Sequence, residues 1–152
     1  MKTRTTIGLV SIFCLSLCFN IAFQKSATAQ EKDNWTEAQL MQPAALAKII
    51  KDNPTSIYIY DIGPSGVIKG AIPIGEGGEP QNIQKMRGII RRLPKNTPIV
   101  VYCGCCPFKN CPNIRPALSL LSELSFTNYK LLNLPNNLKK DWIDKGYPMS
   151  SK

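Results

Sequence analysis

The chain has 152 residues, of which 43% are hydrophobic and 19% charged, and its formal net charge is +9. This length and composition fit one globular domain and exclude a collagen-like, coiled-coil or wholly disordered protein. The chain contains no histidine, so catalytic Ser-His-Asp and Cys-His arrangements and histidine-ligated metal sites are excluded as well.

The first 29 residues have the three-part pattern of a secretory signal peptide. Lys2 and Arg4 precede an apolar run over 7–23, and the small-residue motif Ala-Thr-Ala follows at 27–29. We expect cleavage after Ala29, which predicts a periplasmic or secreted protein with no stable membrane span. An uncleaved membrane anchor is the alternative, because the apolar run is near the shortest length that crosses a bilayer.

After a flexible polar leader at 30–34, the chain shows alternating helical and strand patterns. In chain order, we expect a helix over 43–52, a strand over 57–60, a minor strand over 71–74, a helix over 83–93, a strand over 99–102, a helix over 114–124, a strand over 129–134 and a short helix over 136–144. Apolar residues at helical spacing predict the helices, and short β-branched or aromatic runs predict the strands. Strands that alternate with helices indicate an α/β fold with a parallel sheet covered on both faces.

Four of the six cysteines, Cys103, Cys105, Cys106 and Cys111, lie in the loop between a predicted strand and a predicted helix. In a parallel sheet, chemistry collects at the carboxyl ends of the strands, and Cys103 occupies that position. Free backbone amides and the dipole of the following helix favour a thiolate, which is the nucleophile of cysteine chemistry. Cys103 is therefore the candidate nucleophile, and the other three are candidate resolving or metal-binding thiols.

Three charged residues are candidates for supporting roles. Lys109 and Arg115 add positive charge beside the loop, which suits binding of a small anionic sulfur donor, with solvated surface cations as the alternative. Asp61 ends a predicted strand and would support the active loop through hydrogen bonds or cap a turn. Trp35 and Trp142 are expected to be packing residues.

The cysteine pattern leaves structural alternatives open. A disulfide such as Cys106 with Cys111 would staple the loop and leave it without turnover. A tetrathiolate metal site fits poorly, since the adjacent Cys105 and Cys106 do not suit one tetrahedron, whereas Cu(I) is less demanding. The C-x-x-C from Cys103 to Cys106 is a weak thioredoxin-like signal, because the expected helix does not begin at its first cysteine. No metal is firmly predicted.

Several short motifs follow one another along the chain in a familiar order. Residues 61–63 are similar to a strand-end D-V-R, with Gly63 in place of the arginine, and residues 66–72 are similar to G-H-I-P-G-A-x, with Val67 in place of the histidine. Residues 100–103 resemble a strand that delivers an active cysteine. The closing elements L-x-G-G, W and G-Y-P are matched by Leu134, Trp142 and residues 146–148. In this order the motifs resemble the single-domain rhodanese, or thiosulfate sulfurtransferase, family.

The resemblance implies a rhodanese-like domain over 35–152 with a five-stranded, mostly parallel sheet. It also implies a cysteine, Cys103 by position, that cycles through a persulfide and needs no cofactor. Sulfane sulfur would pass from thiosulfate or a similar anionic donor to a thiol or cyanide acceptor. The loop departs from the family pattern: a compact C-x4-R-S is usual, whereas the stretch from Cys103 to Arg115 is longer and holds three more cysteines.

Three functional hypotheses follow, in this order. The first is an exported rhodanese-like sulfurtransferase in which a second thiol, such as Cys106 or Cys111, resolves the persulfide, with a periplasmic thiol reductant as a further partner. The second is a module that holds Cu(I) or another soft metal, and the third is a non-catalytic domain locked by disulfides. Nucleic acid is excluded as a partner, because the positive charge is scattered and the protein is expected to be exported.

Overall fold

A computed structural model describes residues 33–64, 66 and 68–151 of the chain. The predicted signal peptide at 1–29 and residues 30–32 of the predicted leader lie outside the described residues. The strands are β1 (Leu40–Met41), β2 (Tyr58–Asp61), β3 (Ala71–Pro73), β4 (Ile99–Tyr102) and β5 (Tyr129–Leu132). The α-helices are α1 (Pro43–Asp52), α2 (Pro80–Ile90), α3 (Ile114–Glu123) and α4 (Leu138–Asp141), and the short 3-10 helices are η1 (Glu37–Gln39), η2 (Phe108–Asn110) and η3 (Ile143–Lys145).

The five strands form one sheet in the order β1-β5-β4-β2-β3, and every neighbouring pair runs parallel. β4 lies in the middle, and all four of its residues are buried. This burial explains its uninterrupted apolar sequence, which is typical of a parallel strand covered on both faces. The predicted α/β fold with a five-stranded parallel sheet is confirmed.

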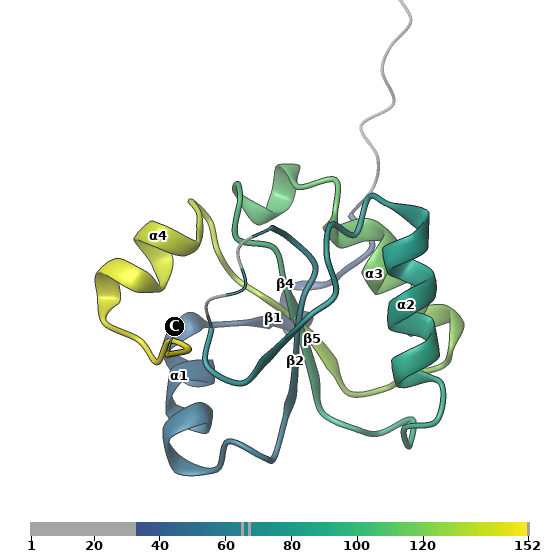
Figure 1. Cartoon of the computed structure of the whole chain (residues 1–152), viewed down its shortest axis with the longest axis horizontal. Helices are drawn as coiled ribbons and strands as arrows, with labels where there is room; N and C mark the ends of the chain where they lie inside the picture. The colour runs from purple at the N-terminus through teal and green to yellow at the C-terminus, as the bar shows by residue number, and fades with distance from the viewer. Residues whose placement is uncertain (1–32, 65, 67, 152) are drawn as a thin grey trace, which may run out of the picture. The chain divides into compact units, whose positions relative to one another are not determined.

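Helices cover both faces of the sheet. Figure 1 shows α2 and α3 on one side and α1 and α4 on the other. Successive residues of a strand point to opposite faces, so Val101 belongs to the apolar cluster of α2 and α3, whereas Val100 belongs to that of α1 and α4. Two separate cores therefore hold β4, and through it the loop that follows, in a single position.

The C-terminal segment packs against the apolar cluster of α1 and α4. Trp142 is fully buried, and its indole Nε1 donates a hydrogen bond to the Pro148 carbonyl at 3.0 Å. Ile68 and Met149 form an isolated antiparallel bridge that ties this segment to the loop after β2. Trp142 is a packing residue, as its sequence position predicted.

Several elements differ from their predicted bounds by a few residues, and α2 is shifted most. The predicted strand over 129–134 ends at Leu132, and the predicted helix over 136–144 is α4 followed by η3. α2 covers Pro80–Ile90, not 83–93. It begins earlier because Pro80 takes the first helical position, where its missing N–H costs no hydrogen bond, and it ends earlier because the Leu93 N–H bonds to the Ile90 carbonyl in a tighter turn. β1, only two residues long, was not predicted from the pattern. No helix among the described residues is long and apolar enough to cross a membrane.

Candidate active site

Cys103 directly follows β4 at the carboxyl edge of the sheet, and its side chain is only 1% exposed. The loop after it is fastened to neighbouring elements. The Phe108 N–H bonds to the Leu134 carbonyl after β5, and the Leu138 N–H at the start of α4 bonds to the Gly104 carbonyl, both at 3.1 Å. These two hydrogen bonds fix the cysteine loop, and with it Cys103, to the segment after β5 and to α4.

Several hydrogen-bond donors converge on the sulfur of Cys103. The pKa of Cys103 is lowered from 9.0 to about 5, chiefly by a hydrogen bond from the Cys111 thiol. The Asn113 amide and the backbone N–H of Cys105 lower it further, while burial opposes them. The expected stabilisation by backbone amides is therefore only part of the cause, because side chains supply most of the donors. These donors favour the thiolate form of Cys103 at neutral pH without a histidine.

Asn113 is a site residue that the sequence analysis missed. Its side chain is 5% exposed, and it precedes the first residue of α3. Its Nδ2 donates to the Cys103 sulfur at 3.5 Å, and its Oδ1 accepts the Gly78 N–H at 2.9 Å. Gly77 lies so close to the Asn113 carbonyl that a Cβ there would clash. The asparagine before the helix predicts only a helix cap, but its side chain makes no cap hydrogen bond and donates to the sulfur instead.

The other three cysteines lie at different depths. Cys111 is fully buried, and the hydrogen bond that it donates to Cys103 is the main cause of its raised pKa. Cys105 is exposed, and its sulfur lies 3.2 Å from that of Cys103. The pKa of Cys105 is raised to about 12, chiefly by desolvation of its thiol. Cys106 is half-buried, with its sulfur 3.3 Å from that of Cys105. All four are free thiols, without the Cys106–Cys111 disulfide that was considered as an alternative.

Asp61 supports the turn that passes beside Cys103. Its carboxylate is 1% exposed and accepts hydrogen bonds from the backbone N–H groups of Gly63, at 2.9 Å, and Gly66. Burial raises the pKa of Asp61, and these hydrogen bonds oppose the rise. A Cβ at Gly63 would lie 2.7 Å from the Cys103 sulfur. The turn therefore packs directly on the sulfur, and glycine is the residue that this close approach allows.

Three of the sulfurs are close enough to share a metal ion. The Sγ atoms of Cys103, Cys105 and Cys111 all lie within 4.8 Å of one another. Thiolates are the ligands that select soft ions such as Cu(I). The same cluster can therefore hold a metal or carry out thiol chemistry.

Comparison with known proteins finds similarity in the fold. No protein-family model matches the chain, and no curated protein does. A rhodanese-like domain from Anabaena superposes with a TM-score of 0.52 at 18% identity, covering 75% of this chain and 80% of its own. The fold is rhodanese-like. A Bacillus halodurans protein gives a TM-score of 0.54 at 22% identity, covering 73% of this chain and 75% of its own, and a Lactobacillus plantarum protein gives 0.54 at 15%, covering 76% and 89%.

At these identities the likeness shows the fold alone, and the superpositions confirm the rhodanese-like architecture that the motifs implied.

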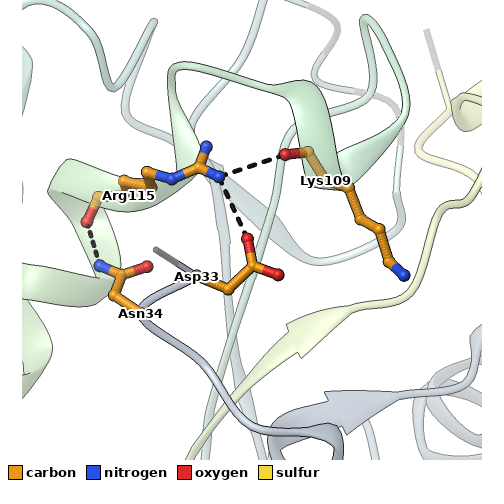
Figure 2. A network of polar contacts seen from close by, with 4 residues as sticks. All are labelled: Asp33, Asn34, Lys109 and Arg115. Atoms are coloured by element: carbon orange, nitrogen blue, oxygen red, sulfur yellow. Dashed lines mark hydrogen bonds and ion pairs between the residues drawn. The ribbon is translucent and has the colours of Figure 1, made fainter. Parts of the chain in front are cut away.

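Arg115 lies in the first turn of α3, directly after the cysteine loop. Its guanidinium Nη2 donates to the Asp33 carboxylate at 3.1 Å and to the Lys109 carbonyl at 3.3 Å (Figure 2). The guanidinium also lies 5.2 Å from the centre of the Trp35 ring. Asn34 donates to the Arg115 carbonyl at 2.9 Å. Arg115 therefore connects the segment before β1 to α3 and to the cysteine loop.

The Lys109 side chain is exposed and points away from Arg115 (Figure 2). Its ammonium lies 6.0 Å from the centre of the Phe108 ring. The structure thus brings the Lys109 carbonyl, but not its ammonium, to Arg115. Binding of an anionic substrate by Lys109 and Arg115 stays a prediction.

A cavity of about 260 Å³ lies at the carboxyl ends of β1 and β5, where Gln42 and Asn133 are among its lining residues. None of its lining residues is a cysteine. The cavity is therefore separate from the cysteine loop, and its titratable lining residues are Asp141, Lys145 and Tyr147.

Proposed function

We propose that this protein is an exported sulfurtransferase that carries sulfane sulfur as a persulfide on Cys103. The observation that carries the proposal is the approach of the Cys111 sulfur and the Asn113 amide to the Cys103 sulfur at the carboxyl end of β4. Donors arranged in this way favour a thiolate, the reactive form of cysteine. The rhodanese-like fold supports the same chemistry by analogy.

The reaction has two halves. The Cys103 thiolate attacks the outer sulfur of thiosulfate, the S–S bond of thiosulfate breaks, and sulfite leaves with the bonding electron pair. An acceptor thiolate then attacks the outer sulfur of the persulfide, and Cys103 leaves as a thiolate. Because a thiol of low pKa is a better leaving group, the donors from Cys111 and Asn113 assist this second half as well.

Mass spectrometry tests the assignment of Cys103. Reduced protein is treated with thiosulfate, alkylated and digested, and the peptide that carries Cys103 is expected to gain about 32 Da, one sulfur atom. The Cys103→Ser variant should lose this adduct while keeping the circular dichroism spectrum of the native protein. An adduct confined to another cysteine, or none in the native chain, contradicts the assignment.

Export is tested separately from chemistry. If the chain is expressed in full in a bacterium with a periplasm, we expect the mature protein in the periplasmic fraction with Gln30 as its first residue, because signal peptidases cut after small-residue motifs. Intact mass measurement identifies the cleavage point. A protein that keeps Met1, or that stays in the membrane fraction, would contradict the proposal that it is exported.

A second candidate function, soft-metal binding, is favoured by the mutual approach of the sulfurs of Cys103, Cys105 and Cys111. Protein purified under reducing, anaerobic conditions and exposed to Cu(I) would then retain about one ion per chain. Replacement of Cys111 with serine would release this ion. Retention of copper without any persulfide after thiosulfate treatment would favour the metal function over sulfur transfer.

A further inference from the structure

Among the described residues, Cys111, Asn113, Gly63 and Cys105 lie close to the Cys103 sulfur, and they differ in their access to solvent. Cys111 is 0% exposed, Asn113 is 5% exposed, and Gly63 is buried. Cys105 is the one exposed residue among the four. Solvent therefore reaches the neighbourhood of the Cys103 sulfur on the side of Cys105.

A persulfide on Cys103 would carry its outer sulfur about 2 Å from Sγ, the length of an S–S bond. The main chain of Gly63 lies close to the sulfur on another side, because a Cβ at that position would lie 2.7 Å from Sγ. Cys105 has its own sulfur 3.2 Å from that of Cys103. The outer sulfur of the persulfide would accordingly be in contact with Cys105. A bulky acceptor that approaches from solvent would contact Cys105 before it could reach Cys103.

We propose that Cys105 is the exit thiol of this site, which takes the outer sulfur from Cys103 and presents it at the surface to a thiol acceptor. This inference rests on the proposed sulfurtransferase function and adds the route by which sulfur leaves. The sequence left Cys105, Cys106 and Cys111 as candidate resolving thiols, with Cys106 and Cys111 as the examples, and the geometry favours Cys105. Cys111 is fully buried, and the Cys106 sulfur contacts those of Cys105 and Cys111.

The transfer step is balanced without an oxidant or a reductant. The Cys105 sulfur attacks the outer sulfur of the Cys103 persulfide, and the bond between that sulfur and Cys103 breaks. The electron pair returns to Cys103, which leaves as a thiolate. The proton of the Cys105 thiol passes to the new persulfide, so that Cys103-S-S⁻ and Cys105-SH become Cys103-S⁻ and Cys105-S-SH. A thiol acceptor then removes the sulfur from Cys105 by the same exchange.

The experiment follows sulfur through a single turnover of the full mature chain. Reduced protein is loaded with thiosulfate, desalted and mixed with glutathione, and samples are alkylated at intervals for peptide mapping. We expect persulfide on Cys105 to appear after that on Cys103. In Cys105→Ser, which keeps the shape of cysteine but cannot carry sulfur, we expect normal loading of Cys103 and release to glutathione slowed about tenfold or more.

Two further variants separate this route from others. In Cys106→Ser, persulfide should still move from Cys103 to Cys105, because the 3.2 Å contact between these two sulfurs does not involve Cys106. Asn110→Ser, a substitution at an exposed residue of η2, controls for general disturbance of the loop.

Several outcomes would overturn the role of Cys105. One is release from Cys105→Ser at the native rate. Another is a Cys103–Cys105 disulfide formed with loss of hydrogen sulfide, since that product requires attack on the inner sulfur. A third is failure of folded Cys105→Ser to load, which would place Cys105 in sulfur uptake. If that variant does not fold, the native chain provides the test: persulfide that never appears on Cys105, or that appears there before Cys103, would overturn the role of Cys105. Absence of any persulfide on native Cys103 would instead identify failure of the proposed function itself.

Discussion

Asn113 makes one hydrogen bond to the Cys103 sulfur and another to the main chain of Gly78. Rotation of its amide would break both bonds, so the bond to Gly78 keeps the Nδ2 donor directed at the sulfur. The glycine-rich turn before α2 therefore orients a hydrogen-bond donor of the cysteine loop. At the scale of single residues, the site is therefore a thiolate whose donors are held by contacts with a second loop.

Replacement of Asn113 with alanine should raise the pKa of Cys103 by about one to two units, since a hydrogen bond to a charged group is worth about 1.5–3 kcal/mol. The pH dependence of Cys103 alkylation measures this pKa. Asn113→Asp is the matched control, because it keeps the acceptor for the Gly78 N–H while it loses the donor. The pKa should rise at least as far in Asn113→Asp. An unchanged pKa in that variant would show that Asn113 has only a structural role.

Alkylation of native Cys103 by iodoacetamide should be half-maximal near pH 5, where an ordinary thiol is half-maximal near pH 9. The cause is the set of hydrogen bonds led by Cys111. Peptide mapping at a series of pH values gives the profile for Cys103 alone. A midpoint above pH 8 would remove the thiolate on which the proposed function depends.

The same shift makes stability depend on pH. A thiol whose pKa is lowered on folding stabilises the protein fully above its unfolded pKa of 9.0, and this contribution is lost as pH falls through about 5. The unfolding free energy of the native protein relative to Cys103→Ser should therefore rise from pH 5 to 9. The raised pKa values of Cys105 and Cys111 act in the opposite sense, but above pH 9. Denaturant unfolding of both proteins at each pH measures the difference.

At the scale of elements, two glycines of similar appearance in the sequence have different surroundings. A Cβ at Gly63, in the turn after β2, would lie 2.7 Å from the Cys103 sulfur, whereas a Cβ at Gly88, within α2, would meet nothing within 4 Å. Gly63→Ala should destabilise the protein by about 1–3 kcal/mol through overpacking. Gly88→Ala should stabilise it by about 0.5–1 kcal/mol through helix propensity.

Denaturant unfolding measures both alanine variants. Gly63→Ala should also slow persulfide loading, because the Cβ displaces the reactive sulfur, while Gly88→Ala leaves loading unchanged. Equal effects of the two substitutions on stability would contradict the close packing of Gly63 against Cys103.

Most elements could be predicted because their signals are local. β4 is four consecutive buried apolar residues, and the apolar stripe of α3 repeats at helical spacing, so short windows of sequence contain the whole pattern. β1 could not be found in this way. Its two residues become a strand because they pair with Leu131 and Leu132 of β5, a contact between segments far apart in the chain.

At the scale of the whole molecule, Arg115 connects the start of the described chain to the cysteine loop. Its side chain bonds to Asp33 and the Lys109 carbonyl, and it lies over the Trp35 ring. Arg115→Gln should therefore lower stability by about 1 kcal/mol, from the loss of a partly buried ion pair and of stacking. It should also increase proteolytic cleavage before β1.

Thermal unfolding and limited proteolysis measure these effects of Arg115→Gln, and Asp33→Asn is the matched variant that removes the ion pair but keeps the stacking on Trp35. A smaller loss of stability in Asp33→Asn is expected. The KM for thiosulfate, measured on both variants, tests the sequence-based prediction that Arg115 binds the anionic donor: that prediction requires a raised KM in Arg115→Gln alone. Unchanged stability in both variants would contradict the connecting role of Arg115.

The sequence by itself determined that the fold is α/β, that Cys103 directly follows a buried strand, and that Asp61 lies at the end of another, because each of these properties is a pattern within a few neighbouring residues. Only the tertiary structure decided which groups surround the sulfur. Gly63, Asn113 and Gly78 come from three separate segments, and the contact between Gly78 and Asn113 joins residues 35 positions apart. Such contacts follow from how the helices and loops pack on the sheet, and this packing places one thiol at the surface and another beneath it.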